Sequence, residues 1–365
     1  MRILVLNAGS SSLKTSLVVE PGDRTEARTD AALPAGQDWV EALGAIASEA
    51  GTFEAVGHRV VHGGSEHVAS ERITDNVMAG LERLRDLAPL HNSPALDAMA
   101  AARRTFPDVP HVAAFDTAFH ATLPQDAITY PVPFEWRAAF GVRRYGFHGL
   151  SVAWATERAA ELLGRPVADL RVVVAHLGSG CSVTAVDGGR SAETSMGMTP
   201  LEGLMMATRS GSVDPGILLE LSRRGDVSAD DLGEALQHRS GLFGVSGVSG
   251  DLREVQGAAE GGNARAQLAV AMFIRRAAAG IAAAASALPT LDAVVFTAGI
   301  GEHAAAVRTA ICARLSTMNV PSELRAPDGA DDQVLSRPGS SVAVVRIAAR
   351  EDLVIARETA RLLAG

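Results

Sequence analysis

One pattern occurs twice in the sequence, about half a chain apart, and it constrains the fold more than any other feature. The stretches are ILVLNAGSSSLKTSLVV, from Ile3, and VVVAHLGSGCSVTAV, from Val172. In each, an apolar run leads into a turn of small residues, and a second run with the period of a strand follows. Gly9 in the first stretch corresponds to Gly178 in the second. Two such strand–turn–strand hairpins predict two duplicated domains that face each other.

The rest of the chain alternates between strand and helix patterns, which is typical of an α/β fold. The predicted strands are residues 55–62, 111–119, 292–299 and 341–348, and the predicted helices lie near 78–87, 151–163, 264–287 and 351–363. Residues 20–36 combine turn formers with no period, so we expect a surface connection there.

Length and charge exclude some classes of protein. The 365 residues, 47% of them hydrophobic, are enough for two folded domains with a buried core. The net charge is -9 and there is no run rich in Lys and Arg, which argues against nucleic-acid binding. Small anions held by a few local arginines remain compatible with this charge.

Cysteine spacing and apolar runs indicate the compartment. Cys181 and Cys312 match no metal or disulfide spacing, which favours a reducing cytosol. The first apolar run is only four residues long, too short for a leader segment. The Ala-rich run 277–288 follows two arginines and ends at Pro289, so we interpret it as a buried helix. We expect a soluble, cytoplasmic protein that binds no membrane.

The first hairpin turn is a candidate phosphate site. Backbone N–H groups and the hydroxyls of Ser10 and Ser12 can donate to phosphate oxygens, and Lys14, the only lysine among 33 basic residues, adds a compact charge. The spacing is not that of a Walker loop, and a strand rather than a helix follows. An ordinary polar turn with an exposed lysine is the alternative.

Two further glycine turns follow apolar runs. They are HLGSG (176–180) and FTAGIGEH (296–303). Open α/β sheets bind ligands at the carboxyl ends of their strands, so the three turns together indicate a nucleotide site. The second turn lacks a full dinucleotide fingerprint because position 304 is alanine. Each turn taken singly has a purely structural explanation.

Four charged or titratable residues occur in apolar or glycine-rich surroundings. They are Arg59 in GHRVVHGG, Asp116 in FDTAFH, His148 in RRYGFHG and Arg209 in MMATRSG. Such residues are usually paired or functional. A structural ion pair, for example between Arg59 and Asp116, is the alternative to a catalytic role. The histidines are too irregular in spacing to indicate a zinc site.

These motifs resemble those of acetate kinases, and they occur in the same order. The sequence carries NAGSSSLK, GHRVVHGG, APLHN, FDTAFH, RRYGFHG, HLGSG, TSMGMTPLEGLMMATRSG, FTAGIGEH and EDLVIARET, which span essentially the whole chain. The resemblance implies the fold of sugar kinases, heat-shock chaperones and actin, which is ribonuclease H-like. It also implies an N-terminal domain of residues 1–147 completed by 351–365, and a nucleotide-binding and dimerisation domain of residues 148–350.

The resemblance further implies a reaction. The γ-phosphoryl group of ATP passes reversibly and in line to acetate, giving acetyl phosphate and ADP. Arg59 would bind the acetate carboxylate, and His148 and Arg209 would stabilise the transferring phosphoryl group. Asn7 and Glu351 would hold Mg²⁺, with Mn²⁺ as a substitute, although Glu351 also suits a helix N-terminus.

Asp116 matches the catalytic aspartate of the family. A carboxylic acid with a pKa of about 4.3 is already ionised at neutral pH, so it needs no base. We therefore expect Asp116 to orient Arg59 or His148.

The remaining implied residues form two groups. The methyl group of acetate would contact Val61, Leu90, Phe147 and Pro200, and a smaller residue at position 61 would indicate propionate. Lys14 would lie near the ATP phosphates, with Ser10 and Ser12. The other implied nucleotide residues are His176, Leu177, Gly178, Ser179, Gly180, Asp251, Leu252, Arg253, Gly299, Ile300, Gly301, Glu302 and His303.

This sequence departs from the family pattern mainly beside the nucleotide turns. Ser179, Ala207, Leu252, Ala298 and His303 replace residues that are common in acetate kinases, which puts nucleotide affinity in question. The family implies a homodimer. A propionate or butyrate kinase and a non-catalytic nucleotide-binding module of the same fold remain alternatives. The apolar methyl pocket argues against a carbohydrate kinase.

Overall fold

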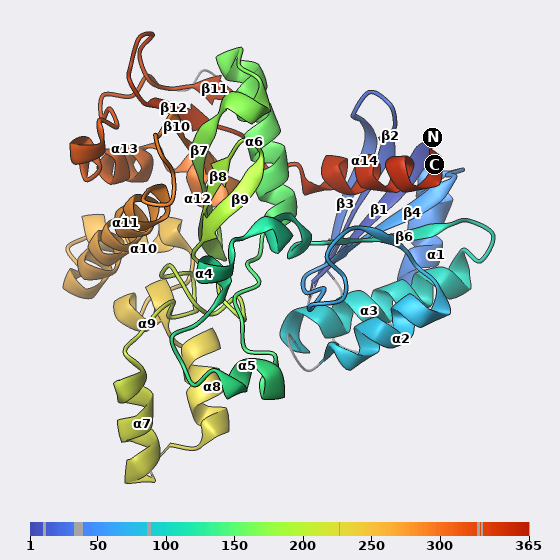
Figure 1. Ribbon diagram of the computed structural model, residues 1–365, viewed down its shortest axis with the longest axis horizontal. Coiled ribbons are helices and arrows are strands. Elements are labelled where there is room, and N and C mark those ends of the chain that lie inside the picture. Colours follow the sequence, from blue (N-terminus) through green and yellow to red (C-terminus); the bar gives the residue numbers. More distant parts are fainter. Residues whose placement is uncertain are drawn as a thin grey trace. The chain divides into compact units, whose positions relative to one another are not determined.

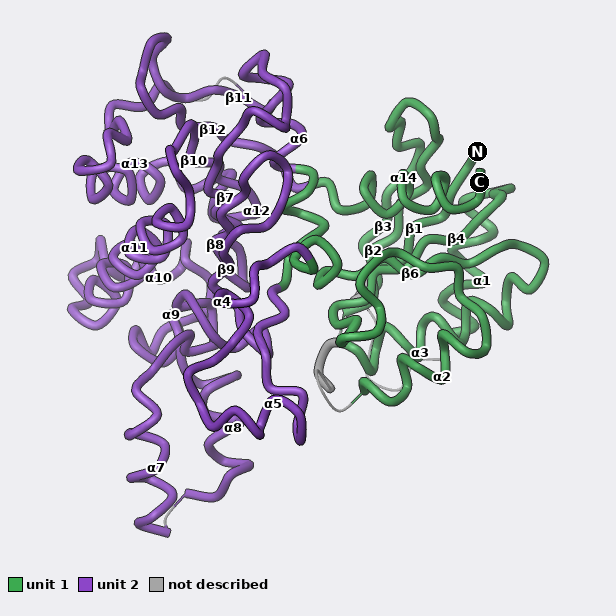
Figure 2. Tube along the Cα trace, viewed as in Figure 1, with its two compact units in different colours: residues 1–121, 147–154, 350–365 green, residues 122–146, 155–349 purple. Residues whose placement is uncertain are grey.

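The computed structural model describes residues 1–9, 12–32, 39–85, 89–225, 227–326, 329 and 331–364. The chain forms two compact units, which Figure 2 colours separately. Unit 1 comprises residues 1–121, 147–154 and 350–365, and unit 2 comprises 122–146 and 155–349. The prediction divided the two domains after residue 147. In the structure, residues 122–146 belong to unit 2, and residues 148–154 belong to unit 1. The predicted functional domains themselves stay a prediction.

Unit 1 is built on a six-stranded sheet with the order β3-β2-β1-β4-β6-β5. Its strands are β1 (Arg2–Ala8), β2 (Ser12–Val19), β3 (Arg24–Ala32), β4 (Ala55–Val60), β5 (Glu71–Arg72) and β6 (His111–Phe115). The first predicted hairpin is confirmed, because β1 and β2 are antiparallel neighbours. β4 runs parallel to β1 and β6 runs parallel to β4, so these three strands end at the same edge.

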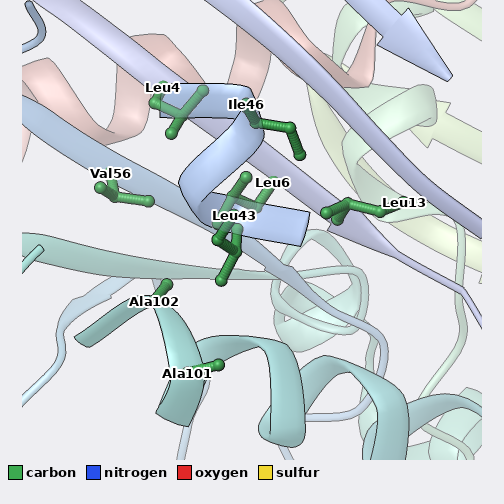
Figure 3. Close-up of a cluster of buried hydrophobic side chains, with 8 residues drawn as sticks. All are labelled: Leu4, Leu6, Leu13, Leu43, Ile46, Val56, Ala101 and Ala102. Atoms are coloured by element: carbon green, nitrogen blue, oxygen red, sulfur yellow. The ribbon is translucent and has the colours of Figure 1, made fainter. Parts of the chain in front are cut away.

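Helices cover both faces of this sheet (Figure 1). α1 (Trp39–Ala50) and α3 (Pro89–Thr105) cover one face, and α2 (Asp75–Arg83) packs beside α3. Figure 3 shows the buried cluster on this face. It consists of Leu4, Leu6, Leu13, Leu43, Ile46, Val56, Ala101 and Ala102.

The opposite face of the sheet is covered by α14 (Glu351–Ala364), which packs on β1, β2, β4 and β6. A Cβ at Gly57 would lie 2.6 Å from Ile355 Cγ2 and 2.7 Å from Thr359 Oγ1, far inside normal contact. Only glycine therefore allows this helix to approach β4 so closely. The prediction that residues 351–363 form a helix is confirmed.

Unit 2 repeats the arrangement, with the order β11-β12-β10-β7-β8-β9. Its strands are β7 (Arg171–Leu177), β8 (Cys181–Asp187), β9 (Arg190–Thr194), β10 (Ala293–Thr297), β11 (Gln333–Val334) and β12 (Ala343–Arg346). The second predicted hairpin is confirmed, because β7 and β8 are antiparallel. In each sheet, three consecutive antiparallel strands are followed by two parallel strands. A short antiparallel strand then forms the edge. The predicted duplication is therefore present.

The longest helix of unit 2 is α11 (Ala264–Ala285), which packs on β7 and β8. Among the described residues it is the one helix whose length and composition would suit a membrane span, a test that core helices also pass. Its contacts with α9, α10 and α13 agree with the predicted buried helix. The other helices are α4 (Gln125–Ile128), α5 (Glu135–Phe140), α7 (Pro215–Arg224), α8 (Ala229–His238), α9 (Gly241–Ser246), α10 (Leu252–Glu260), α12 (Ala298–His303) and α13 (Ala305–Ala313). α6 (Gly149–Leu163) contributes residues to both units.

The prediction for residues 20–36 is wrong. We expected a surface connection, but 24–32 form β3, which pairs with β2 along its length, and 33–36 lie outside the described residues. Its RTEARTDAA sequence is polar because an edge strand is stabilised by backbone hydrogen bonds and needs no continuous apolar face. The predicted strands 111–119 and 292–299 are also too long, since they end at Phe115 and Thr297.

Candidate active site

Four of the predicted site residues meet at one edge of the unit 1 sheet. Arg59 Nε donates to Asp116 Oδ1 at 3.0 Å, and Arg59 Nη2 donates to Asp116 Oδ2 at 2.6 Å. Arg59 Nη1 donates to Asn7 Oδ1 at 3.2 Å, and Asn7 Nδ2 lies 3.5 Å from Glu351 Oε2. β1, β4, the end of β6 and α14 supply these side chains, because the parallel strands end together and α14 begins there.

The electrostatics of this cluster favour a charged Arg59. Burial alone would lower the pKa of its guanidinium, but the charges of Asp116 and Glu351 and the hydrogen bonds to Asp116 outweigh burial and raise it. Asp116 is only 1% exposed, so this pair is strongly shielded from water. The structural pair that we gave as an alternative is therefore present, and it also fixes the orientation of the guanidinium.

Arg59 keeps donors for a further anion. A guanidinium has five N–H groups, and the described contacts with Asp116 and Asn7 use three of them. The two others lie on neighbouring nitrogens, Nη1 and Nη2. Each of these two N–H groups can donate to an oxygen of a small anion such as a carboxylate.

His148 lies in unit 1, in a strained turn just before α6. Its φ of 58° is in the left-handed region, which is uncommon for a residue other than glycine. Two contacts hold the turn: Gly149 N donates to Asp116 O at 3.0 Å, and His120 Nε2 lies 2.9 Å from Phe147 O. A Cβ at Gly149 would lie 2.1 Å from Asp116 O, so the turn also requires this glycine.

The structure places only part of the predicted methyl pocket. Val61 follows β4 and is half-buried, whereas Phe147 is fully buried with its ring 5.4 Å from that of His62. The side chain of Leu90 lies outside the described residues, and Pro200 belongs to unit 2. Sequence reasoning missed the buried Asn92, whose amide accepts from His62 N and donates to His62 O, each at 3.1 Å. Its place in the APLHN motif was the available signal.

The unique lysine lies on the strand after the first turn. Lys14 is on β2, with its side chain 62% exposed, and its Nζ lies 3.7 Å from Asp30 Oδ2 on β3. Ser10 and the side chain of Ser12 lie outside the described residues. The exposed-lysine alternative fits this geometry, and the phosphate role of Lys14 stays a prediction.

Unit 2 contains a cavity of about 630 Å³ at its glycine turns. This volume is within the range of small-molecule sites. The predicted nucleotide residues that line it are Gly178, Ser179, Asp251, Leu252, Arg253, Gly299, Ile300 and His303. The lining residues that sequence reasoning did not assign to the site are Ala207, Gly250, Gln256 and Ala304. Gln256 was predictable from the helical spacing that follows Leu252 on α10.

The other predicted nucleotide residues flank the same turns without lining the cavity. They are His176, Leu177, Gly180, Gly301 and Glu302. Glu302 Oε1 accepts from Ala349 N at 2.9 Å. The buried Arg308, which sequence reasoning missed, donates through Nη1 to Gly301 O and Glu302 O, each at 2.8 Å. Arg308 therefore holds the backbone of this turn through hydrogen bonds to two of its carbonyl groups.

Two of the departures from the family pattern have visible consequences. Ala298 begins α12 with φ of 63°, a conformation that costs a residue with a Cβ about 1 kcal/mol or more. Glycine at this position would not be strained. Ala207 lines the cavity, and a Cβ at Gly250 would lie 3.3 Å from the methyl group of Ala207. The methyl group of Ala207 thus fills space at this wall that a glycine would leave open.

Asp251 has a local role in the cavity wall. It is the N-cap of α10, accepting from Arg253 N at 2.8 Å, and its carboxylate also pairs with the Arg253 guanidinium. The side-chain hydrogen bond from Arg253 lowers the pKa of Asp251 to about 2. The carboxylate is therefore ionised throughout the neutral range.

Arg209 belongs to unit 2 and lies on a long turn. Its Nη1 donates to Pro200 O at 2.7 Å, and burial lowers the pKa of the guanidinium. The turn meets the glycine turn of the second hairpin, because Ala207 N donates to Ser179 O at 3.1 Å. Two of the predicted residues of unit 2, Arg209 and Pro200, are thus in direct contact.

Possible metal ligands in the described part of the chain are sparse. No group of three His, Cys, Asp or Glu side chains is arranged there to hold a metal ion. In unit 1, Asn7 Nδ2 lies 3.5 Å from Glu351 Oε2, while Asn7 Oδ1 accepts from Arg59 Nη1, so the two residues bring an amide oxygen and a carboxylate into one cluster. Mg²⁺ prefers oxygen ligands and commonly takes one or two protein groups together with water and phosphate oxygens. These two residues fit such a site.

Two sheets of the same order, one ending in a charged cluster and the other in a glycine-walled cavity, define a duplicated α/β protein. A sequence model of the acetokinase family matches residues 38–357. The chain belongs to the acetokinase family, as the motifs had indicated.

Individual relatives match along their whole length. The acetate kinase of Gloeobacter violaceus is 44% identical over 98% of each chain, and that of Clavibacter michiganensis is 44% identical over 100% of this chain and 99% of its own. Among solved structures, the acetate kinase of Porphyromonas gingivalis superposes with a TM-score of 0.88 at 34% identity. A propionate kinase of Francisella tularensis gives 0.90 at 35% identity, and each comparison covers 99% of both chains. The predicted fold is confirmed.

Proposed function

We propose that this protein is an acetate kinase, which transfers the γ-phosphoryl group of ATP reversibly and in line to acetate. Membership of the acetokinase family and the named relatives support this proposal. The observation in the structure that carries it is Arg59, held by Asp116 and Asn7 with one N–H left on each of Nη1 and Nη2. A small carboxylate is an anion that these two donors can bind.

The proposed roles follow from the charges that phosphoryl transfer creates. Arg59 binds the acetate carboxylate, and Asp116 keeps its guanidinium in place. Arg209 and His148 stabilise the negative charge on the equatorial oxygens of the transferring group. The cavity at the glycine turns of unit 2 holds the nucleotide, and Lys14 acts on the phosphates.

Asn7 and Glu351 would hold Mg²⁺, for which Mn²⁺ would substitute. The ion would neutralise phosphate charge during transfer. The two residues offer an amide oxygen and a carboxylate, a donor set that suits this hard cation.

We propose acetate as the preferred acid because Val61, Leu90, Phe147 and Pro200 would enclose only a methyl group. One methylene is worth about 1 to 3 kcal/mol of discrimination, so propionate should react slowly. A propionate kinase is the second candidate, since one solved relative bears that name.

We further propose a cytoplasmic homodimer assembled through unit 2. Large apolar side chains are exposed there on and beside two helices, as expected of a surface that is covered in a dimer. They are Phe134, Trp136 and Phe140 at α5 and Ile217 and Leu219 on α7.

The test is an acyl hydroxamate assay on purified protein with ATP, Mg²⁺ and acetate, propionate or butyrate. We expect strong acetate-dependent product that is lost in Arg209→Ala. A preference for propionate would overturn the role given to Val61. Nucleotide binding without product from any acid would favour the non-catalytic module.

A further inference from the structure

Three side chains outside the predicted site meet in unit 2. Tyr130 OH donates to Glu202 Oε2, and Met198 N donates to the Tyr130 oxygen at 3.0 Å. Arg144 Nη2 donates to Glu202 Oε1 at 3.0 Å, and its guanidinium lies 5.3 Å from the centre of the Tyr130 ring. A phenol and a guanidinium thus hold the two oxygens of one carboxylate. We call Tyr130, Arg144 and Glu202 the clamp.

The clamp also grips the backbone that leads into the turn. Arg144 Nη1 donates to the carbonyl oxygens of Thr194, Ser195 and Met196 at 3.1, 3.3 and 2.9 Å. Nη1 has two hydrogens, so at least one N–H is shared between two of these three carbonyls, while Nη2 serves the carboxylate. Arg144 therefore fixes the exit of β9 relative to Glu202.

Gly197 shows how closely the turn fits the clamp. A Cβ at this position would lie 1.8 Å from Glu202 Oε2 and 2.0 Å from the Tyr130 oxygen. Any side chain would displace one of these two groups. The backbone at residue 197 is thus pressed directly against the hydrogen bond between Tyr130 and Glu202.

The segment held in this way carries Pro200. Met198, two residues before it, is bound by Tyr130, and Glu202, two residues after it, is bound by Tyr130 and Arg144. The carbonyl of Pro200 accepts the 2.7 Å hydrogen bond from Arg209 Nη1. Restraints on both sides of Pro200 therefore determine where the Arg209 guanidinium is held.

We propose that Tyr130, Arg144 and Glu202 are positioning residues, which set Pro200 and Arg209 for catalysis without touching the substrate. The inference rests on the proposed function, in which Arg209 stabilises the transferring phosphoryl group and Pro200 faces the methyl group of the acid. It also accounts for the segment 122–146 belonging to unit 2, since this segment delivers Tyr130 and Arg144 to the turn.

Tyr130→Phe tests the clamp with the loss of one oxygen. The matched control is Tyr145→Phe, which removes a hydroxyl that donates to Gly141 O at 3.4 Å and keeps the backbone hydrogen bond from Tyr145 N to Gly197 O. We expect Tyr130→Phe to lower kcat/KM for acetate about ten-fold, equivalent to ~1.4 kcal/mol, and to change the ratio of acetate to propionate turnover. The KM for ATP should stay within about two-fold, because the cavity lining is untouched. Tyr145→Phe should keep all three values.

Glu202→Gln is a second variant that keeps the shape of the side chain and removes its charge. It should lower acetate turnover in the same way and leave the KM for ATP unchanged, and it decides the question if Tyr130→Phe does not fold. Equal kinetics in the two tyrosine variants, or a lower melting temperature with unchanged kinetics, would overturn the inference while the proposed function stands. Wild-type protein that makes no product from any acid would overturn the proposed function and the inference together.

Discussion

The two units share a sheet order but end their strands differently. In unit 1 the edge carries charged and polar side chains, with Arg59, Asp116 and Asn7 in direct contact. In unit 2 the corresponding turns are rich in glycine, and β10 passes directly into α12. One edge presents buried side-chain charge, whereas the other provides backbone groups and a cavity. Substitutions of the buried charges in unit 1 should therefore lower stability and activity strongly, whereas substitutions in unit 2 should have smaller effects.

Asp116→Asn should have the largest effect. Removing one partner of a buried ion pair costs about 3 to 5 kcal/mol, and the partial exposure of Arg59 reduces the expected loss of unfolding free energy to about 2 to 3 kcal/mol. Misplacing the guanidinium should also lower kcat/KM for acetate at least about 100-fold. Chemical denaturation and acetate kinetics measure both effects. Asp30→Asn, which breaks only the exposed pair with Lys14, is the control; an equal loss there would remove the contrast between buried and exposed charge.

Acidification should destabilise unit 1 through a buried histidine. Burial lowers the pKa of His120 to about 4, while the unfolded value is about 6.5. Between these pH values the unfolded chain therefore binds more protons than the folded protein. The contribution of neutral His120 to stability is fully present above pH 6.5 and decreases as the pH falls towards 4. The loss from this residue at pH 5 should be about 2 kcal/mol. Urea unfolding of wild type and His120→Gln at pH 8 and pH 5 measures it, and an equal pH dependence in the two proteins would contradict the assignment.

Ala298→Gly should raise stability in unit 2. Glycine adopts the left-handed conformation without strain, so we expect a gain of about 1 kcal/mol in the free energy of unfolding. Ala313→Gly, at the exposed end of α13, should instead lose about 0.5 to 1 kcal/mol. Thermal melting of both variants checks this, and a loss in both would mean that the strain at 298 is absent.

Lys14→Arg should have the smallest effect on stability, below about 0.5 kcal/mol, because its pair with Asp30 is exposed. If the ammonium contacts phosphate, the larger planar group should raise the KM for ATP about three-fold. Steady-state kinetics at two salt concentrations check this. An unchanged KM for ATP would mean that Lys14 makes only an ordinary surface ion pair with Asp30.

Local patterns in the sequence predicted much of the fold. Both hairpins and the glycine turns of the cavity follow from runs of a few residues, because alternation and small side chains report directly on strand and turn. β3 was missed because an edge strand stabilised by backbone pairing leaves no apolar period. The motif resemblance supplied the site residues, three of which meet around Arg59.

Contacts between distant residues could not be predicted. Tyr130 and Glu202 are 72 positions apart, and nothing near either residue in the sequence indicates the other. The hydrogen bonds from Asn92 to His62 span 30 positions. The strain at Ala298 is also invisible in the sequence, since the left-handed backbone is set by the junction of β10 and α12.

The close approach of α14 to Gly57 has a consequence for how the chain is made on the ribosome. The strands of unit 1 emerge early, but the helix that covers one face of their sheet emerges only after residues 155–349 have been synthesised. Until then the nascent chain exposes the face around Gly57, and Arg59 lacks the neighbouring carboxylate of Glu351. Unit 2 can fold as soon as its own strands are complete, although it comes later in the sequence. Unit 1 is therefore translated first, but its fold is completed after that of unit 2.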